Sequence, residues 1–167
     1  MAGSHPGGRG KAAGSPTSDE PKVLLRNKRA RHEYSIEETL EAGIELRGSE
    51  VKSLRAASAS IAEAYAAPKD GGIFVLQMQI NEYPYASAFQ HPPKRDRRLL
   101  LHHREIDHLS AAVKEKGYTL LPLEIYLKRG RIKVLLGVCK GKQLHDKRQS
   151  ERERDAKREI GRAMRRR

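Results

Sequence analysis

The amino-acid sequence predicts a mainly β fold that carries a few short helices. Apolar and polar residues alternate with a period of two through residues 34–46, 74–80 and 121–138, which places every second side chain on one face of a strand. Residues 50–57 and 103–116 instead have apolar positions three or four apart, the spacing of a helix that packs one face on a core. Several strands and two short helices are therefore expected.

The alternating segments are expected to pair as antiparallel strands. Residues 34–36 and 44–46 flank a Glu-Ala-Gly sequence at 41–43, which we interpret as a turn. A further strand follows an Asp-Gly-Gly turn at residues 70–72. Its expected core face consists of Phe74, Leu76, Met78 and Ile80.

Residues 121–127 and 132–138 are expected to form a hairpin that bends at Gly130, because glycine is favoured where a tight turn requires positive φ. Apolar positions alternate in both arms. They are Leu121, Leu123, Ile125 and Leu127 in the first arm and Ile132, Val134, Leu136 and Val138 in the second.

Each expected helix has a recognisable end. Ser49 can cap the start of the helix over residues 50–57, and Gly117 follows the last residue of the helix over residues 103–116. Their core-facing residues are Val51 and Leu54 in the first helix and Ile106, Leu109 and Val113 in the second. Antiparallel strands with two or three short capping helices predict a small OB-like barrel, since closure removes exposed sheet edges. An open α+β sandwich is the alternative.

The composition divides the chain into three regions. Residues 1–22 lack periodic apolar positions and are expected to form a disordered leader, whereas residues 23–140 form the barrel. Residues 141–167 form a tail rich in Lys and Arg. Ser150 and Glu153 make a capping-box pattern there, but the apolar stripe is too thin to dock firmly on a core. We expect this tail to be disordered alone and helical when bound.

The charge indicates a polyanionic partner. Lys and Arg number 34 against 21 Asp and Glu, so the net charge is +13. No apolar run is long enough to span a bilayer, and the N-terminus lacks the apolar segment of a secretory signal. The single cysteine, Cys139, excludes an internal disulfide. We expect a cytoplasmic monomer with no membrane partner and no cofactor.

Basic residues cluster at 26–32, 94–98 and 128–133, as expected for a surface that follows a phosphate backbone. Aromatic residues make up only 5% of the chain and Trp is absent, which argues against a single-strand binder built on stacking platforms. The pattern favours recognition of a folded RNA by its shape and backbone.

Catalysis and metal binding are not expected. His103 and Asp107 are four residues apart on a predicted helix, near His102 and His108, but no third ligand follows at a defined spacing. We therefore expect a protein that is not an enzyme. A structural ribosomal or rRNA-binding protein is the alternative, and a metal-dependent nuclease is a distant third.

Several stretches, taken in order, closely match one protein family. They are residues 27–34, 36–38, 41–44, 49–56, 99–101, 104–107, 141–142, 145–148 and 153–158. With these motifs the chain resembles the family of small protein B, the SsrA (tmRNA)-binding proteins, from about Asn27 to Met164.

The resemblance implies an OB-like barrel that binds the tRNA-like domain of tmRNA and delivers it to stalled ribosomes for trans-translation, without catalysis. The implied partners are tmRNA charged with alanine, elongation factor Tu, and the small-subunit rRNA of the ribosome at the decoding centre and mRNA channel. In this scheme the barrel replaces the missing anticodon arm, and the tail substitutes for codon–anticodon pairing.

The resemblance also implies two sets of binding residues. The residues expected to bind tmRNA are Asn27, Lys28, Arg29, Arg31, His32, Glu41, Lys52, Arg55, Arg97, Arg98, Leu101 and His102. The tail residues expected to contact the decoding centre and mRNA channel are Lys142, His145, Asp146, Lys147, Arg148, Arg154, Lys157 and Arg158.

Glu41 is unusual in this set because a carboxylate repels phosphate. It is expected to accept a hydrogen bond from a base amino group or to orient a neighbouring Arg, unless it is a plain turn residue. Two sites depart from the family pattern: residues 57–60 read Ala-Ser-Ala-Ser in place of Gly-Lys-Ala-Asn, and His102 replaces a common Asn.

Overall fold

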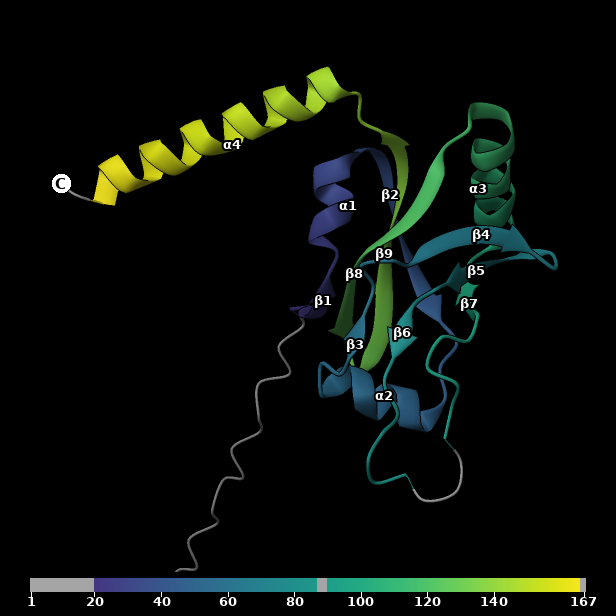
Figure 1. Cartoon of the computed structure of the whole chain (residues 1–167). Coiled ribbons are helices and arrows are strands. Elements are labelled where there is room, and N and C mark those ends of the chain that lie inside the picture. Colours follow the sequence, from purple (N-terminus) through teal and green to yellow (C-terminus); the bar gives the residue numbers. More distant parts are fainter. Residues whose placement is uncertain (1–19, 87–89, 166–167) are drawn as a thin grey trace, which may run out of the picture.

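The computed structural model describes residues 20–86 and 90–165, and within this part Leu144 is described by its backbone alone (Figure 1). The predicted leader of residues 1–22 lies mostly outside the described residues, and the first strand begins at Lys22. No helix in the described ranges is long and apolar enough to cross a membrane.

In the described part of the chain, nine strands make up two sheets. They are β1 (Lys22–Arg26), β2 (Tyr34–Ile44), β3 (Ala59–Ser60), β4 (Tyr65–Lys69), β5 (Gly72–Leu76), β6 (Gln79–Ile80), β7 (Arg97–Leu100), β8 (Thr119–Lys128) and β9 (Arg131–Gly141). Six of them follow one another in the order β8, β4, β5, β7, β2 and β9, and β9 pairs with β8 again to close a ring. Strand β1 pairs with β8 at the end of this sheet, and β3 pairs with β6 in a separate small sheet. All pairings are antiparallel, which confirms the mainly β prediction.

The ring differs from a strict barrel because its sides are unequal. Long ladders join β2 to β9 and β9 to β8. By contrast, β4 and β8 share the single pair Ala66–Leu120, and β7 makes only two pairs with each of its neighbours. The core lies inside the ring, where α3 (His103–Lys116) contributes Leu109.

The expected turn at residues 41–43 is wrong, because β2 continues through it as one strand of 11 residues. The alternation suggested a turn because a bulge near Glu37 shifts the register between β2 and β9. As a result Ile36 packs in a second cluster outside the ring, whereas Leu40, Ala42 and Ile44 pack in the main core.

A second bulge has the same effect in β8. The register with β9 shifts between Pro122 and Glu124, so Leu121 and Leu123 join Cys139 in the outer cluster. Ile125 instead packs in the main core, so the four apolar residues of this strand do not share one face. The hairpin itself is confirmed: Lys128 pairs with Arg131, and the two turn residues Arg129 and Gly130 both have positive φ.

The strand predicted over residues 74–80 is broken. Gln77 has a φ of 57° and separates β5 from β6. In β5 the buried residues are Ile73 and Val75, whereas Phe74 and Leu76 are only half-buried, so the expected core face is wrong for this strand. Met78 and Ile80, beyond the break, are buried as expected.

Residues 20–86 and 90–165 contain four helices: α1 (Lys28–Glu33), α2 (Gly48–Arg55), α3 and α4 (Leu144–Arg165). The predicted bounds of α3 are confirmed, and Gly117 ends it in the left-handed conformation. Helix α2 begins two residues earlier than expected, after Arg47. Helix α1 was not predicted, because a six-residue basic segment shows no apolar periodicity.

An ion pair with no exposed surface joins α2 to β7. Glu50 and Arg97 are both 0% exposed, and Arg97 Nε donates to Glu50 Oε1 at 2.9 Å. Arg95 Nη2 donates to Glu50 Oε2 at 2.7 Å, as does the backbone N–H of Arg47. Burial alone would raise the Glu50 pKa, but the hydrogen bonds from Arg95 and Arg47 and the charges of both arginines outweigh it and lower the pKa.

Arg97 also ties down the connection between β6 and β7. Its guanidinium donates to the carbonyls of Met78 at 2.7 Å and Pro93 at 3.1 Å. In the same connection His91 is buried between Ser49 Oγ, 2.9 Å from Nδ1, and the carbonyl of Ile80, 3.1 Å from Nε2. Since a carbonyl only accepts, Nε2 carries the proton of this contact. Two residues near the start of α2 therefore anchor the connection between β6 and β7: Ser49 contacts His91, and Glu50 binds Arg97.

Replacing Glu50 with Gln should lower the free energy of unfolding by about 3 to 5 kcal/mol, because the variant leaves Arg97 buried without its charge partner. Urea unfolding followed by circular dichroism measures this loss. Glu63→Gln removes an acid from an exposed pair with Arg29 and should cost less than about 1 kcal/mol.

The free energies of unfolding of the wild type and of Glu50→Gln should also depend differently on pH in the acidic range. Because the folded-state pKa of Glu50 lies below its ordinary value of 4.5, its stabilisation is complete above about pH 4.5 and is lost as the pH falls through the folded pKa. Below that pH the stability of the wild type should fall more steeply than that of Glu50→Gln. Parallel pH dependences, or equal losses in both variants, would contradict the role of the pair.

Candidate RNA-binding interface

Helix α1 presents a basic cluster that Asn27 fixes in place. The Asn27 side chain accepts from the backbone N–H of Ala30 at 2.9 Å and donates to the carbonyls of Ile61 at 3.0 Å and Pro122 at 3.2 Å. Asn27 is buried, so its expected direct contact with RNA is corrected: both polar atoms of its side chain are engaged in internal hydrogen bonds that position α1. The exposed basic residues of the helix are Lys28, Arg29 and Arg31, with His32 half-buried beside them.

Exposed ion pairs orient the α1 arginines. Arg29 Nε lies 3.1 Å from Glu33 Oε1 and its Nη1 contacts Glu63, while Arg31 Nη2 lies 2.9 Å from Glu124 Oε1. The hydrogen bond that Arg29 donates to the Glu33 carboxylate is the largest cause that raises the pKa of Arg29. Because exposed pairs contribute little to stability, these guanidinium groups can exchange a carboxylate for a phosphate at small cost.

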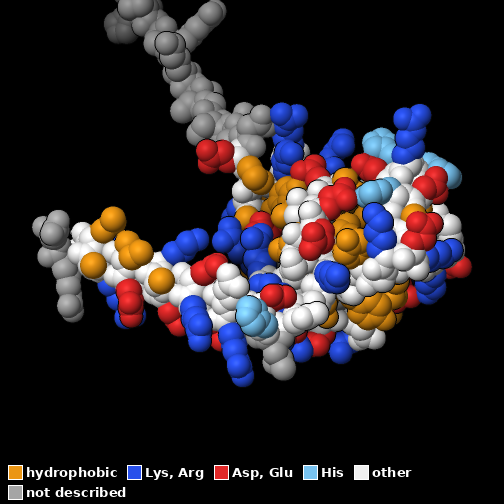
Figure 2. All heavy atoms as spheres, turned by 90° about the horizontal axis from the view of Figure 1, so that it is seen from above, with side chains coloured by type: hydrophobic (Ala, Val, Ile, Leu, Met, Phe, Trp, Pro, Cys, Tyr) orange, Lys and Arg blue, Asp and Glu red, His pale blue; other side chains and the backbone are white. Residues whose placement is uncertain are grey.

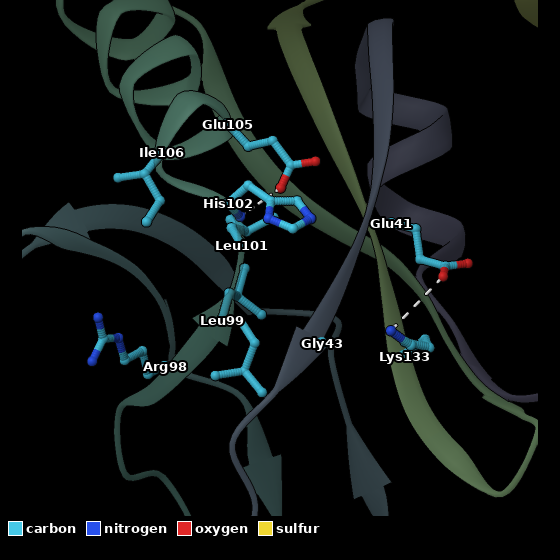
Figure 3. A pocket seen from close by; sticks show the side chains of 10 residues that line it. Glu41, Gly43, Arg98, Leu99, Leu101, His102, Glu105, Ile106 and Lys133 are labelled. Carbon is cyan, nitrogen blue, oxygen red and sulfur yellow. Dashed lines mark hydrogen bonds and ion pairs between the residues drawn. The ribbon is translucent and has the colours of Figure 1, made fainter.

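Four of the predicted RNA-binding residues line one open pocket of about 470 Å³ between β2, β7 and the start of α3, and the guanidinium group of one of them, Arg98, points away from the other three side chains, toward Gly72 (Figure 3). They are Glu41, Arg98, Leu101 and His102. Gly43 allows β2 and β7 to approach here, since a Cβ at this position would lie 3.1 Å from the Cβ of Leu100. His102 precedes the first residue of α3, and its backbone N–H donates to Glu105 at 2.8 Å.

Glu41 organises the basic side of this pocket. Its carboxylate accepts hydrogen bonds from Tyr126 Oη and from Lys128 Nζ at 3.0 Å, and it lies 3.9 Å from Lys133 Nζ. The Tyr126 and Lys128 hydrogen bonds lower the pKa of Glu41, so it is ionised at neutral pH. Burial, and then the bond to Glu41, raise the pKa of Tyr126. Of the two roles expected for Glu41, the orientation of a neighbouring basic side chain therefore has a structural counterpart. The side chains that Glu41 orients are lysines and not the expected Arg.

The other predicted residues of the barrel lie elsewhere. Lys52 and Arg55 are exposed on α2, at the opposite end of the ring from α1 (Figure 1). Arg97 has no exposed surface and all its contacts are internal, so the expectation that it binds RNA directly is corrected. Arg98, the next residue of β7, has its side chain on the other face of the strand and is exposed.

The tail forms a helix that extends away from the ring (Figures 1 and 2). Helix α4 begins at Leu144, six residues before the expected cap Ser150. Between this helix and the body, His32 Nε2 lies 3.1 Å from Glu151 Oε1, and Arg154 donates to the carbonyl of Arg31 at 3.3 Å. The exposed tail residues of the predicted set are His145, Asp146, Arg148, Arg154, Lys157 and Arg158. Lys142 and Lys147 are half-buried near the junction.

The His103–Asp107 pair does not extend to a metal site. His103 Nδ1 lies 2.9 Å from Asp107 Oδ2, and both side chains are well exposed. Within residues 20–86 and 90–165, no group of three His, Cys, Asp or Glu residues is placed to hold a metal ion.

A closed ring of antiparallel strands, basic patches at separate sites and a projecting basic helix define a small basic protein of the RNA-binding class. Residues 24–166 match the family model described as "SmpB protein", and the chain belongs to this family.

The chain is similar to proteins named "SsrA-binding protein" over most of its length. It is 54% identical to one from Rhodopseudomonas palustris over 86% of this chain and 92% of the relative. It is 48% identical to one from Myxococcus xanthus over 96% of this chain and 98% of the relative. A solved structure described as "tmRNA-SmpB: a journey to the center of the bacterial ribosome" is 46% identical, with a TM-score of 0.61 over 73% of this chain and 86% of that one.

Three residues of the pocket region were not on the predicted list: Tyr126, Lys128 and Lys133. The sequence shows the basic run at 128–133, but the contact of its lysines with Glu41 depends on β2 and β8 lying on either side of β9. Tyr126 pairs with Lys133, which in turn pairs with Gly43, so the three strands bring these side chains together. A correct prediction of how β2, β9 and β8 pair would therefore have located these three residues beside Glu41.

Proposed function

We propose that this protein binds the tRNA-like domain of tmRNA and delivers it to stalled ribosomes for trans-translation. The observation that carries the proposal is the pocket that Glu41, Arg98, Leu101, His102 and Lys133 line together. These residues come from three strands, β2, β7 and β9, and from the connection between β7 and α3, and such a shared open surface is expected of a binding site. The names of the relatives and of the similar structure identify the RNA.

The α1 cluster and the pocket supply the contacts with the RNA backbone and with base edges. Arg29, Arg31 and Lys133 neutralise phosphates, while Glu41 accepts a hydrogen bond from a base amino group or keeps Lys128 and Lys133 in place. The protein acts as an adaptor and catalyses no reaction. It acts in the cytoplasm together with the alanine-charged tmRNA, which elongation factor Tu carries.

The tail has a separate role in the ribosome. Helix α4 projects its basic residues into solvent with few body contacts, so it is free to enter the mRNA channel and decoding centre in place of a codon–anticodon pair. His145 stacks on or hydrogen-bonds an rRNA base, while Lys147 and Arg148 bind phosphates. A structural ribosomal protein is the second candidate, because the same basic surface would also suit permanent rRNA binding.

Binding of the full-length protein to tmRNA and to an elongator tRNA, each across a salt series, tests the proposal. A preference for tmRNA that persists near 0.2 M salt is expected, since purely electrostatic binding fades there. Equal and steeply salt-dependent binding of the two RNAs would overturn the proposal and favour the ribosomal alternative.

Removing residues 145–167 should leave tmRNA binding largely intact and abolish peptide tagging. The physical reason is that the pocket and α1 lie on the ring, whereas the deleted helix makes few contacts with it. Filter binding measures the first quantity, and a reconstituted translation reaction on a truncated message measures the second. Loss of tmRNA affinity on truncation would contradict this division between ring and tail.

The substitution Glu41→Gln distinguishes a role of Glu41 in positioning Lys128 and Lys133 from a simple effect of its negative charge on RNA binding. The substitution removes a negative charge, so non-specific electrostatics predicts unchanged or tighter binding to any RNA. We expect instead that tmRNA affinity falls roughly tenfold, about 1.4 kcal/mol, because Lys128 and Lys133 lose their common partner. Affinity for elongator tRNA should not fall.

Glu38→Gln is the matched control on the same strand. It also removes one acid, from an exposed pair with His108, and should leave tmRNA affinity unchanged or slightly raised. If the two variants bind tmRNA equally, Glu41 has no positioning role.

A further inference from the structure

Two tyrosines of the connection between β6 and β7 form an exposed aromatic pair beside α2. Tyr85 is 85% exposed, more than any other large apolar side chain in the described ranges. Its ring lies 5.6 Å from that of Tyr83, centroid to centroid, with an interplanar angle of 65°. The ammonium group of Lys52, on α2, lies 5.4 Å from the centroid of the Tyr83 ring.

The pair is held by contacts that do not involve the rings. Gln90 Nε2 donates to the carbonyls of Tyr83 and Ala86, each at 3.0 Å, and the backbone N–H of Ala86 donates to the carbonyl of Tyr83. Beyond this turn, His91 contacts Ser49 of α2, the helix that also carries Lys52. Both the aromatic pair and the cation are therefore fixed relative to the same helix.

The surroundings indicate what this pair can bind. Among the large apolar residues that are exposed in residues 20–86 and 90–165, Tyr85 lies in this connection and presents its ring to solvent. One exposed ring suffices to stack one base, and the positive side chains of Lys52 and Arg55 suit the phosphates that flank it.

We propose that Tyr85, supported by Tyr83, stacks on one unpaired base of tmRNA, and that Lys52 binds a phosphate next to that base. The identity of the RNA rests on the proposed function; the stacking chemistry rests on the geometry of the aromatic pair. This contact lies on α2 and its neighbouring connection, apart from the pocket around Glu41.

The test compares tmRNA affinity in full-length variants across a salt series. Tyr85→Ala should weaken binding roughly tenfold with an unchanged salt slope, because stacking releases no counterions. Tyr85→Phe keeps the ring and should bind like the wild type. Lys52→Ala should lower the salt slope by about one, as expected for one lost phosphate contact. Since Tyr85 is exposed, its variants should keep the circular dichroism and urea midpoint of the wild type.

Ultraviolet cross-linking of the wild-type complex, followed by mass spectrometry, locates the stacked ring. A nucleotide adduct on Tyr85 or Tyr83 is expected. If Tyr85→Ala binds tmRNA like the wild type while the preference over elongator tRNA persists, the stacking site is overturned and the proposed function stands. If Tyr85→Phe fails like Tyr85→Ala, the hydroxyl rather than the ring makes the contact, and stacking is again overturned. A wild type without that preference overturns both.

Discussion

The ion pair between Glu50 and Arg97 is the constraint on which the arrangement of the surface depends. Two charges without exposed surface are tolerated only because Arg95, the backbone of Arg47 and the carbonyls of Met78 and Pro93 complete their hydrogen bonds. The same bonds hold α2 and the connection before β7 together. The same buried hydrogen bonds consequently hold the basic side chains of α2 and the tyrosines of the connection relative to one another. The exposed surfaces of these side chains remain accessible to ligands.

Two bulges decide how the ring divides its apolar residues. One lies in β2 and the other in β8, on either side of β9, and both strands change face beyond them. The ring therefore has a main core inside and a smaller cluster around Ala30 and Cys139 outside. Because Ala30 belongs to α1, the outer cluster packs this basic helix against the sheet. The burial of Cys139 also raises the pKa of its thiol to about 11, which keeps it unreactive at neutral pH.

The sequence allowed prediction of the features that depend on local patterns, and failed where long-range pairing decides. Helix α3 and the turn at Gly130 follow from apolar spacing and glycine, so their bounds were correct. The bulges have no local signal, so one continuous strand was mistaken for two. Arg97 and Arg98 are neighbours in a basic run, and only the pairing of β7 with β5 and β2 determines which of them points inward. The resemblance to the family predicted four residues that line the pocket, and their binding of RNA stays a prediction, whereas finding the lysines around Glu41 required knowledge of strand order.

The tail helix acts as a spacer of fixed length. Its 22 residues span about 33 Å at 1.5 Å per residue, which is comparable to the diameter of a small domain. The distance between the ring and the far end of the helix is therefore set by residue number, and its rotational phase by 100° per residue. An insertion or deletion of one residue before Leu144 would turn every basic side chain of the helix to a new direction without altering any contact within the ring.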